Sequence, residues 1–364
     1  MRLSGTMNET QLYLELNPFS ILDLFSFITA LVLAVLFVSR KSENQKANIF
    51  LALALFSLAF EVFDVLTQSI YPINLVFVQS TLFTIPFLFF YIYQSTNQRI
   101  KKKYYLLFLP GILHNTLFYF LEMENELTYF EYAFNIPLLV FILKQLKKHT
   151  EKLQEFYSDI ENKTLRWLKL IVYVFLGFHA LWILEDLVGF QYDYMFEYFA
   201  FLSSIFTFFM IFWIGHFGFS QQESFKKRLF LEKTSEGNNI KEEALSTNKE
   251  VEVFDEIRNK IIKEKVFKNP KLNLRILAGS VHLNQKELSR IINQQPGNNF
   301  YQLINQIRVD EFKRLMNSDE SQKLSIIGMA QESGFNSKST FYTAFKNLEG
   351  ITPKQYEQQL NKSD

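Results

Sequence analysis

The chain has no cysteine among its 364 residues, which excludes disulfides, thiolate metal sites and a cysteine nucleophile. It also lacks the HExxH pattern of zinc metalloproteases and the serine–histidine pair in a glycine-rich setting that marks rhomboid-like enzymes. The first apolar run, residues 19–38, has neither a basic leader nor a small-residue cleavage site, so a cleavable signal peptide is not expected. We therefore predict no catalytic residue, no metal site and no cofactor, and we do not expect an enzyme.

Charge of either sign is scarce in long stretches of the first 220 residues. The net charge is only +1, but the chain contains 41 phenylalanines and 17 tyrosines, most of them before residue 220. After that point lysine, glutamate, asparagine and glutamine become frequent. This composition predicts a lipid-soluble part joined to a water-soluble part.

Seven apolar segments reach or approach the length that crosses a membrane, which is about 20 residues for a helix. They are residues 19–39, 47–69, 72–94, 104–121, 127–143, 167–188 and 195–219. The fifth segment is the least typical, because it is short and carries Glu131, Asn135 and Pro137. The fold class predicted for residues 1–220 is an all-α bundle of seven transmembrane helices.

The loops between these segments alternate in charge. One set is basic and carries Arg40, Lys41, Lys46, Arg99, Lys101, Lys102, Lys103, Lys144, Lys147, Lys148, Lys152 and Lys163. The alternate loops, near residues 70–72, 122–126 and 189–194, have no lysine or arginine. Since basic loops stay in the cytoplasm, the N-terminus is predicted outside and residues 220–364 inside. Buried core helices of a soluble protein would not produce this alternation.

Acidic residues are concentrated toward the outer half of the predicted bundle. They are Asp23, Glu61, Asp64, Glu131, Glu185, Asp186 and Glu197, while His114 and His179 lie near mid-membrane. A charged residue at a helix centre costs about 2.5–3.5 kcal/mol, so these acids need compensation. We predict an outward-facing pocket for a small-molecule signal, lined by Glu61, Asp64, His179 and Glu185. The alternative is that the acids reach interfacial water and form ordinary interhelical hydrogen bonds.

Residues 221–249 form a polar linker, and the basic cluster Lys226, Lys227 and Arg228 in it follows the last apolar segment closely. Such a cluster next to a span favours contact with anionic lipid over contact with nucleic acid. From residue 253 the apolar period becomes helical and stops before Asn269-Pro270. Residues 250–364 are therefore predicted to form a separate cytoplasmic domain.

Two similar segments in this domain, residues 277–293 and 329–347, have the spacing of helix-turn-helix units. Each has a small residue for close helix packing, a large apolar residue at the turn and an asparagine predicted to cap the second helix. These are Ala278, Leu283 and Asn284 in the first unit and Ala330, Phe335 and Asn336 in the second. Glu287 is predicted to complete a capping box in the first unit. His282 and Gly334 stand where a left-handed turn residue is needed.

The second helix of each unit separates an apolar face from a polar one. The apolar residues are Leu288, Ile291 and Ile292 in the first unit and Phe341, Ala344 and Phe345 in the second. The polar residues, predicted to contact DNA, are Gln285, Lys286, Ser289, Arg290 and Asn293, then Lys338, Ser339, Tyr342, Thr343 and Lys346. Side chains of these types read base edges and bind phosphates. A long helix containing Phe300 and Leu315 would hold the two units at a fixed separation.

Residues 272–357 resemble an AraC-type (AraC/XylS-like) DNA-binding domain. The residues that carry the resemblance are Ala278, Leu288, Arg308, Gly334-Phe335, Phe341, Phe345-Lys346, Gly350 and Thr352-Pro353. The sequence departs from the family pattern at His282 and Phe312, and both departures affect packing rather than DNA-facing groups. The resemblance covers less than a quarter of the chain and implies promoter binding and transcription control.

We therefore predict a membrane-bound form of such a regulator in the bacterial cytoplasmic membrane, with its DNA-binding domain in the cytoplasm. Its expected partners are double-stranded promoter DNA, the lipid bilayer, RNA polymerase, a second copy of the chain and an unidentified small-molecule signal. Two alternatives remain. The domain could be released by proteolysis in the linker, or the bundle could be transporter-like with a regulatory DNA-binding appendage. Convincing internal repeats, which many transporters show, are absent from the sequence.

Overall fold

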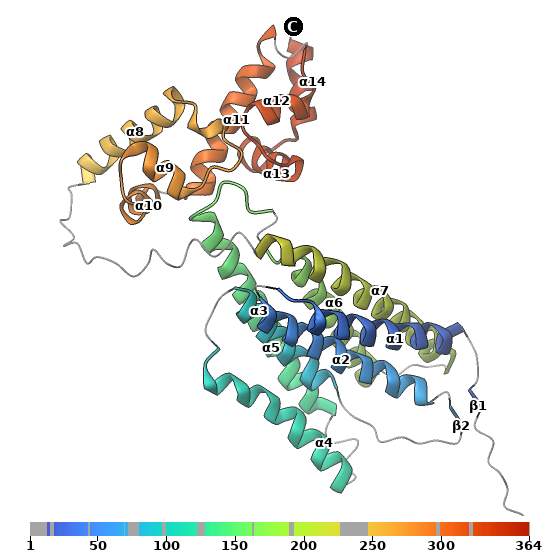
Figure 1. Cartoon of the computed structure of the whole chain (residues 1–364). Coiled ribbons are helices and arrows are strands. Elements are labelled where there is room, and N and C mark those ends of the chain that lie inside the picture. The colour runs from blue at the N-terminus through green and yellow to red at the C-terminus, as the bar shows by residue number, and fades with distance from the viewer. Residues whose placement is uncertain are drawn as a thin grey trace, which may run out of the picture. The chain divides into compact units, whose positions relative to one another are not determined.

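The computed structural model describes residues 13–14, 18–42, 44–68, 70–71, 80–96, 100–121, 128–161, 164–188, 193–225, 247–295, 299–319 and 323–363. This part of the chain is helical, apart from the two-residue strands β1 (Tyr13–Leu14) and β2 (Ile70–Tyr71), which pair antiparallel. The chain forms two compact units (Figure 1). The first comprises Met1–Leu146 and Leu165–Phe230, and the second comprises Lys147–Thr164 and Leu231–Asp364.

The helices of the first unit lie at the positions of the predicted apolar segments. They are α1 (Pro18–Ser39), α2 (Gln45–Gln68), α3 (Thr81–Ser95), α4 (Leu109–Leu121), α5 (Thr128–Gln154), α6 (Arg166–Val188) and α7 (Asp193–Phe225). A short 3₁₀ helix, η1 (Lys102–Phe108), precedes α4. The last turns of α5 belong to the second unit. The predicted all-α character of this part is confirmed.

Four described helices are long and apolar enough to cross a membrane. The qualifying stretches are Ser20–Ser39, Gln45–Phe63, Arg166–Leu184 and Phe201–Ser220, in α1, α2, α6 and α7. Helices α3 and α4, with 15 and 13 residues, are shorter than the length that a single straight span requires. Helix α5 has 27 residues, but its C-terminal half is rich in lysine.

The core of the first unit is formed by large apolar side chains from six of these helices. The most deeply buried include Phe37, Leu51, Leu55, Phe89, Phe90, Leu139, Ile142, Leu168 and Ile211. Helix α7 comes close to α1 and α2 at Gly218, where a Cβ atom would lie 2.6 Å from Cζ of Phe37 and 2.9 Å from Cδ2 of Leu51. A side chain at this position would require Phe37 and Leu51 to shift.

The outward faces of these helices are also apolar. On α1 and α7, Phe25, Val35, Phe209 and Phe212 are each at least 60% exposed. Large exposed apolar residues occur on α2, α4 and α6 as well. Soluble proteins rarely expose contiguous apolar surface of this extent, whereas lipid tails would cover it.

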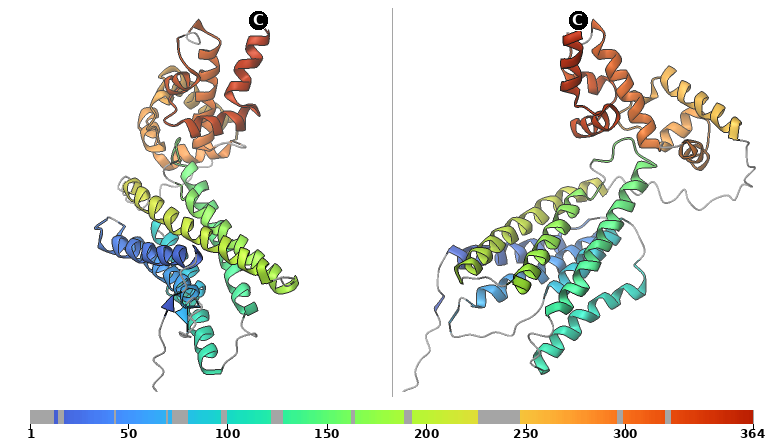
Figure 2. Two further views of the ribbon diagram at one scale, coloured as in Figure 1. Left: turned by 90° about the vertical axis from the view of Figure 1, so that its right-hand side faces the viewer. Right: turned by 180° about the vertical axis from the view of Figure 1, so that it is seen from behind.

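The second unit contains the helix-turn-helix elements. Its helices are α8 (Thr247–Lys263), α9 (Leu274–Val281), α10 (Gln285–Gln294), α11 (Phe300–Met316), α12 (Ile326–Glu332), α13 (Lys338–Glu349) and α14 (Pro353–Ser363), with the 3₁₀ turn η4 (Val266–Lys268) after α8. All views in Figures 1 and 2 show α11 joining the α8–α10 group to the α12–α14 group.

Helix α11 contributes to two separate hydrophobic cores. Its first half, including Phe300 and Ile304, packs with α8, α9 and α10. Its second half, including Val309 and Phe312, packs with α12 and α13. Phe312 is fully buried, and its ring centroid lies 4.7 Å from that of Phe341. The predicted linking helix is therefore confirmed, and it contributes to the cores of both helix-turn-helix units.

Candidate nucleic-acid interface

The first helix-turn-helix unit consists of α9 and α10. Helix α9 ends at His282, which adopts the left-handed conformation with φ of 59°, as expected for the turn position. The backbone N–H of Leu283 then donates to the carbonyl oxygen of Ala278 at 3.0 Å. Asn284 caps α10, because its side-chain oxygen accepts from the backbone N–H of Glu287 at 2.8 Å. This predicted N-cap is confirmed.

The capping box is built differently from the prediction. The carboxylate of Glu287 accepts from the side-chain amide of Asn284 at 3.2 Å. In a standard capping box the N3 side chain reaches the backbone N–H of the capping residue. The second hydrogen bond of the box therefore joins two side chains and does not reach the backbone.

The second helix-turn-helix unit, α12 and α13, has a tighter turn. Gly334 has φ of +94°, and a Cβ atom there would lie 2.4 Å from the carbonyl oxygen of Phe267 and 2.8 Å from Cα of Lys268. Both the backbone conformation and the space require glycine. The N–H of Phe335 donates to the carbonyl of Ala330 at 3.0 Å, which repeats the arrangement of the first unit.

The prediction that Asn336 caps α13 is wrong. Ser337 is the N-cap, and its Oγ accepts from the backbone N–H of Thr340 at 3.1 Å. The side-chain amide of Asn336 instead donates to Oδ2 of Asp159 at 2.9 Å. The asparagine is drawn away from the helix end by a carboxylate that lies far away in the sequence.

Both second helices have the predicted two-faced pattern. The apolar residues Leu288, Ile291, Ile292, Phe341, Ala344 and Phe345 are buried. Of the ten residues predicted to contact DNA, Lys286, Asn293, Lys338, Thr343 and Lys346 are exposed. The others, Gln285, Ser289, Arg290, Ser339 and Tyr342, are partly exposed. The Lys338 ammonium lies 5.5 Å from the centroid of the Tyr342 ring.

Arg308 on α11 fixes this helix to the segment that precedes the first unit. Its side chain is fully buried, with Nε donating to the carbonyl of Phe267 and Nη2 to that of Asn269, both at 2.8 Å. Burial lowers the pKa of Arg308 to about 10, while the nearby Asp159 carboxylate opposes this shift. The guanidinium is therefore charged at neutral pH, and its role is structural.

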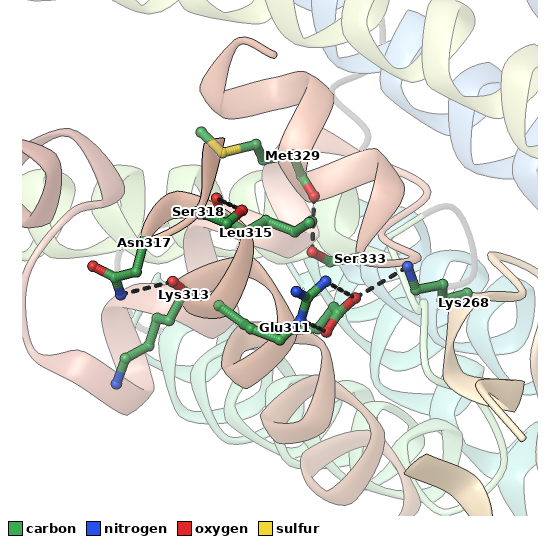
Figure 3. Close-up of polar contacts among 9 residues, drawn as sticks. Lys268, Glu311, Lys313, Leu315, Asn317, Ser318, Met329 and Ser333 are labelled. Atoms are coloured by element: carbon green, nitrogen blue, oxygen red, sulfur yellow. Dashed lines mark hydrogen bonds and ion pairs between the residues drawn. The ribbon is translucent and has the colours of Figure 1, made fainter. Parts of the chain in front are cut away.

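Ion pairs connect α11 to the turn η4, which precedes the first helix-turn-helix unit, and to α13 of the second. The Glu311 carboxylate binds Lys268 at 3.0 Å and Arg314 at 2.7 Å. Figure 3 shows its contact with Lys268. Hydrogen bonds from Arg314 and Lys268 hold the pKa of Glu311 below its usual range. Lys313 binds Glu349 on α13 at 3.0 Å, and this hydrogen bond raises the pKa of Lys313.

Figure 3 also shows hydrogen bonds from side chains to carbonyl groups at the C-terminal ends of α11 and α12. Ser333 Oγ donates to the carbonyl of Met329 at 2.8 Å, and Ser318 Oγ donates to that of Leu315 at 2.8 Å. The amide of Asn317 donates to the carbonyl of Lys313 at 2.9 Å. Carbonyl groups in the last turns of both helices are thereby satisfied.

In the first compact unit, two of the acids noted in the sequence have hydroxyl partners. Glu61 accepts a hydrogen bond from Ser80, and Glu131 accepts one from Thr81. No sequence pattern predicts these two hydroxyl partners, because they depend on how α2, α3 and α5 pack.

Asn135 extends this polar network to a histidine. Its amide lies 3.2 Å from Oε1 of Glu131 and 3.2 Å from Nε2 of His179, and its side chain is fully buried. The side chains of Asp64 and Glu185 lie outside the described residues, so their place in the predicted pocket is not tested.

Residues 156–161, between α5 and α6, form contacts that the sequence does not predict. The charge pattern predicts a cytoplasmic loop of the membrane domain here, whereas these residues lie in the second compact unit and contact α9, α11 and α13. The loop carries no motif that predicts such contacts.

Comparison with known protein families finds a match, which lies in the second compact unit. Residues 277–359 match the family model described as a helix-turn-helix domain, which includes α10–α13 and most of α9 and α14. No curated protein and no solved structure matches the chain significantly. The matched region covers the residues that carry the AraC-type resemblance. Geometry and family match together support a DNA-binding transcription regulator of the AraC type.

Proposed function

We propose that the chain is a membrane-embedded, sequence-specific transcription regulator that couples an extracytoplasmic or membrane-borne signal to promoter binding. The observation that carries this proposal is the pair of recognition helices, α10 and α13, which both pack against the single helix α11. Residues 1–220 are the membrane domain, 221–249 the linker and 250–364 the DNA-binding domain. The location is the bacterial cytoplasmic membrane, crossed several times.

The polar faces of α10 and α13 provide the DNA contacts in this proposal. Arg290 and Lys338 lie on the partly or fully exposed sides of these helices and are assigned to base edges in successive major-groove segments. Lys346 is near the end of α13 and is assigned to phosphate. A second copy of the chain on an adjacent half-site, and RNA polymerase, are the proposed protein partners.

The test of this interface uses the full chain in lipid nanodiscs. Arg290→Ala and Lys338→Ala are each expected to weaken binding to a selected duplex by about 1–3 kcal/mol. Lys346→Ala should weaken all sequences alike. Lys354→Ala on α14, which removes an exposed lysine outside these faces, is the matched control. Unchanged binding in both the Arg290 and Lys338 variants, with helicity intact, would refute the assigned recognition face.

Membrane embedding is supported by the four candidate spans and by the apolar outward surfaces of the first unit. Seven spans, with the N-terminus outside, are proposed because the loop charges alternate over seven helices. Reporter fusions after residues 70, 124 and 191 should report an external position, and fusions after 43, 101 and 155 an internal one. The reverse pattern, or an even number of spans, would contradict this topology.

The polar network around Glu61, Glu131 and His179 is proposed as part of an outward-facing signal site, with Asp64 and Glu185 completing it. The network contains two carboxylates and a fully buried amide whose oxygen Oδ1, on Asn135, accepts no hydrogen bond in the structure. Acids placed among apolar helices need a cationic or hydrogen-bonding partner, which a ligand can supply. Interfacial acids with purely structural hydrogen bonds are the alternative.

A promoter reporter distinguishes these two roles. The double variant Glu61→Gln/Asp64→Asn should abolish the signal response at unchanged membrane levels of the protein. Asp23→Asn, which alters a buried acid on α1 outside this network, is the matched control. A normal response in the double variant would show that the acids are structural.

Proteolytic release is tested in the same cells. An immunoblot against the C-terminus should show the intact chain in the membrane fraction whether or not the promoter is active. A soluble fragment of about one third of the chain that appears with activity would contradict signal coupling in the intact protein. It would support cleavage in the linker instead.

A further inference from the structure

The loop between α5 and α6 packs into the DNA-binding unit. Phe156 lies against the core formed by α8–α11, and its carbonyl oxygen accepts from the backbone N–H of Leu274 at 3.0 Å. The next residue, Tyr157, pairs with Asn273 in an antiparallel bridge. The loop therefore adds a short extended segment at the start of α9.

Ser158 anchors this segment in the interior. Its side chain is fully buried, and its Oγ donates to the carbonyl of Leu272 at 2.8 Å. Its own carbonyl accepts from the side-chain amide of Asn305, a buried residue on α11, at 3.1 Å. Buried polar groups are costly unless paired, so these two bonds favour one defined position of the segment.

The following residues reach the second recognition helix. Asp159 is only 8% exposed, and its carboxylate accepts from Asn336 at 2.9 Å and from the hydroxyl of Thr340, in the first turn of α13, at 3.1 Å. Glu161 lines an open hollow together with Ser337, Lys338, Ser339 and Tyr342. Three of these four residues are on the proposed DNA-facing side of α13.

These contacts place two acidic residues where DNA would have to bind. In helix-turn-helix proteins the first residues of the recognition helix contact base edges, and free N–H groups at helix N-termini favour phosphate. A carboxylate bonded to Thr340 blocks that end of α13. Asp159 and Glu161 also add negative charge that repels the DNA backbone.

We propose that residues 156–161, named here the docking segment, are an intramolecular inhibitor that competes with DNA for the N-terminal end of α13. This inference rests on the proposed function, because it assumes that α13 binds DNA. The docked state blocks α13, so the two recognition helices cannot engage DNA together.

The docking segment lies between α5 and α6, the two helices that carry residues of the proposed signal site. Helix α5 carries Glu131 and Asn135 and ends at Gln154, two residues before Phe156. Helix α6, which carries His179, begins at Arg166, five residues after Glu161. A ligand that binds more tightly when α5 and α6 hold the segment away from α13 shifts the population to the DNA-binding state.

A disulfide lock tests the inference in the full chain, which has no cysteine of its own. Tyr157 and Asn273 are direct antiparallel partners, whose Cα atoms are about 4.5–5.5 Å apart, within the range that a disulfide spans. The Tyr157→Cys/Asn273→Cys double variant is placed in nanodiscs, and its affinity for a fluorescent duplex selected from a random library is measured. The oxidised form should bind about tenfold more weakly than the reduced form. Each single variant, treated with the same oxidant, is the control.

Removal of the charge provides a second measurement that does not depend on the lock. Asp159→Asn should bind the duplex several-fold more tightly than the wild type, whereas Glu151→Gln, an equal charge change in the exposed last part of α5, should not. Equal affinity of the oxidised and reduced forms, with DNA still bound, would overturn the inhibition and leave the proposed function standing. Absence of DNA binding in every folded form would overturn both.

Discussion

The turn between α12 and α13 can be tested with one added methyl group. Gly334→Ala places a Cβ atom 2.4 Å from the carbonyl oxygen of Phe267, the same oxygen that accepts the Nε hydrogen bond of Arg308 at 2.8 Å. A left-handed backbone costs an alanine about 1–2 kcal/mol. Overpacking adds about 1–3 kcal/mol, because either the turn or the Phe267 carbonyl must move.

The expected loss in free energy of unfolding is therefore about 2–5 kcal/mol. Gly350→Ala is the matched control: φ there is +75°, but nothing lies within 4 Å of the added Cβ. This control should lose only the backbone contribution, about 1–2 kcal/mol. Urea unfolding of the fragment 250–364, followed by far-ultraviolet circular dichroism, measures both. Equal losses would refute the close approach of the turn to Phe267.

Three further predictions concern other contacts of the structure. Ser337→Ala should destabilise the domain by about 1 kcal/mol through loss of the α13 cap, whereas Asn336→Ala should leave the cap intact. A larger destabilisation by Asn336→Ala than by Ser337→Ala in urea unfolding would instead indicate that the asparagine is the cap. Glu311→Gln should remove a stabilisation that is present above pH 4.5, the ordinary pKa of the carboxyl, and that fades as pH falls through the lower folded-state value; identical pH profiles of unfolding would contradict the ion-pair role. Gly218→Leu should disrupt helix packing and lower the thermal stability of the detergent-solubilised bundle, while Gly177→Leu, with open space around it, should be tolerated; equal stability would refute the α7 contact.

The sequence predicted those features that depend on neighbouring residues in the chain. The positions of the apolar helices follow from run length, and the buried faces of α10 and α13 follow from helical periodicity. The left-handed residues His282 and Gly334 follow from turn spacing. These are local properties, and the structure confirms them.

Features that depend on distant contacts could not be predicted. Asn284 and Asn336 occupy equivalent positions in the two units, but only Asn284 caps its helix, because Asp159 attracts the other. Likewise, Ser80 and Thr81 acquire their acidic partners only when three helices pack together. No spacing rule connects residues 159 and 336.

In the proposed function, the intact membrane protein binds specific DNA sites. The most direct measurement is crosslinking of the tagged full chain in living cells, recovery from the membrane fraction and sequencing of the bound DNA, for the wild type and the Arg290→Ala/Lys338→Ala double variant. We expect a small set of enriched promoter sites with the wild type and their loss in the double variant at equal protein levels. Recovery from membranes without enriched sites, or the same sites in both proteins, would contradict the claim.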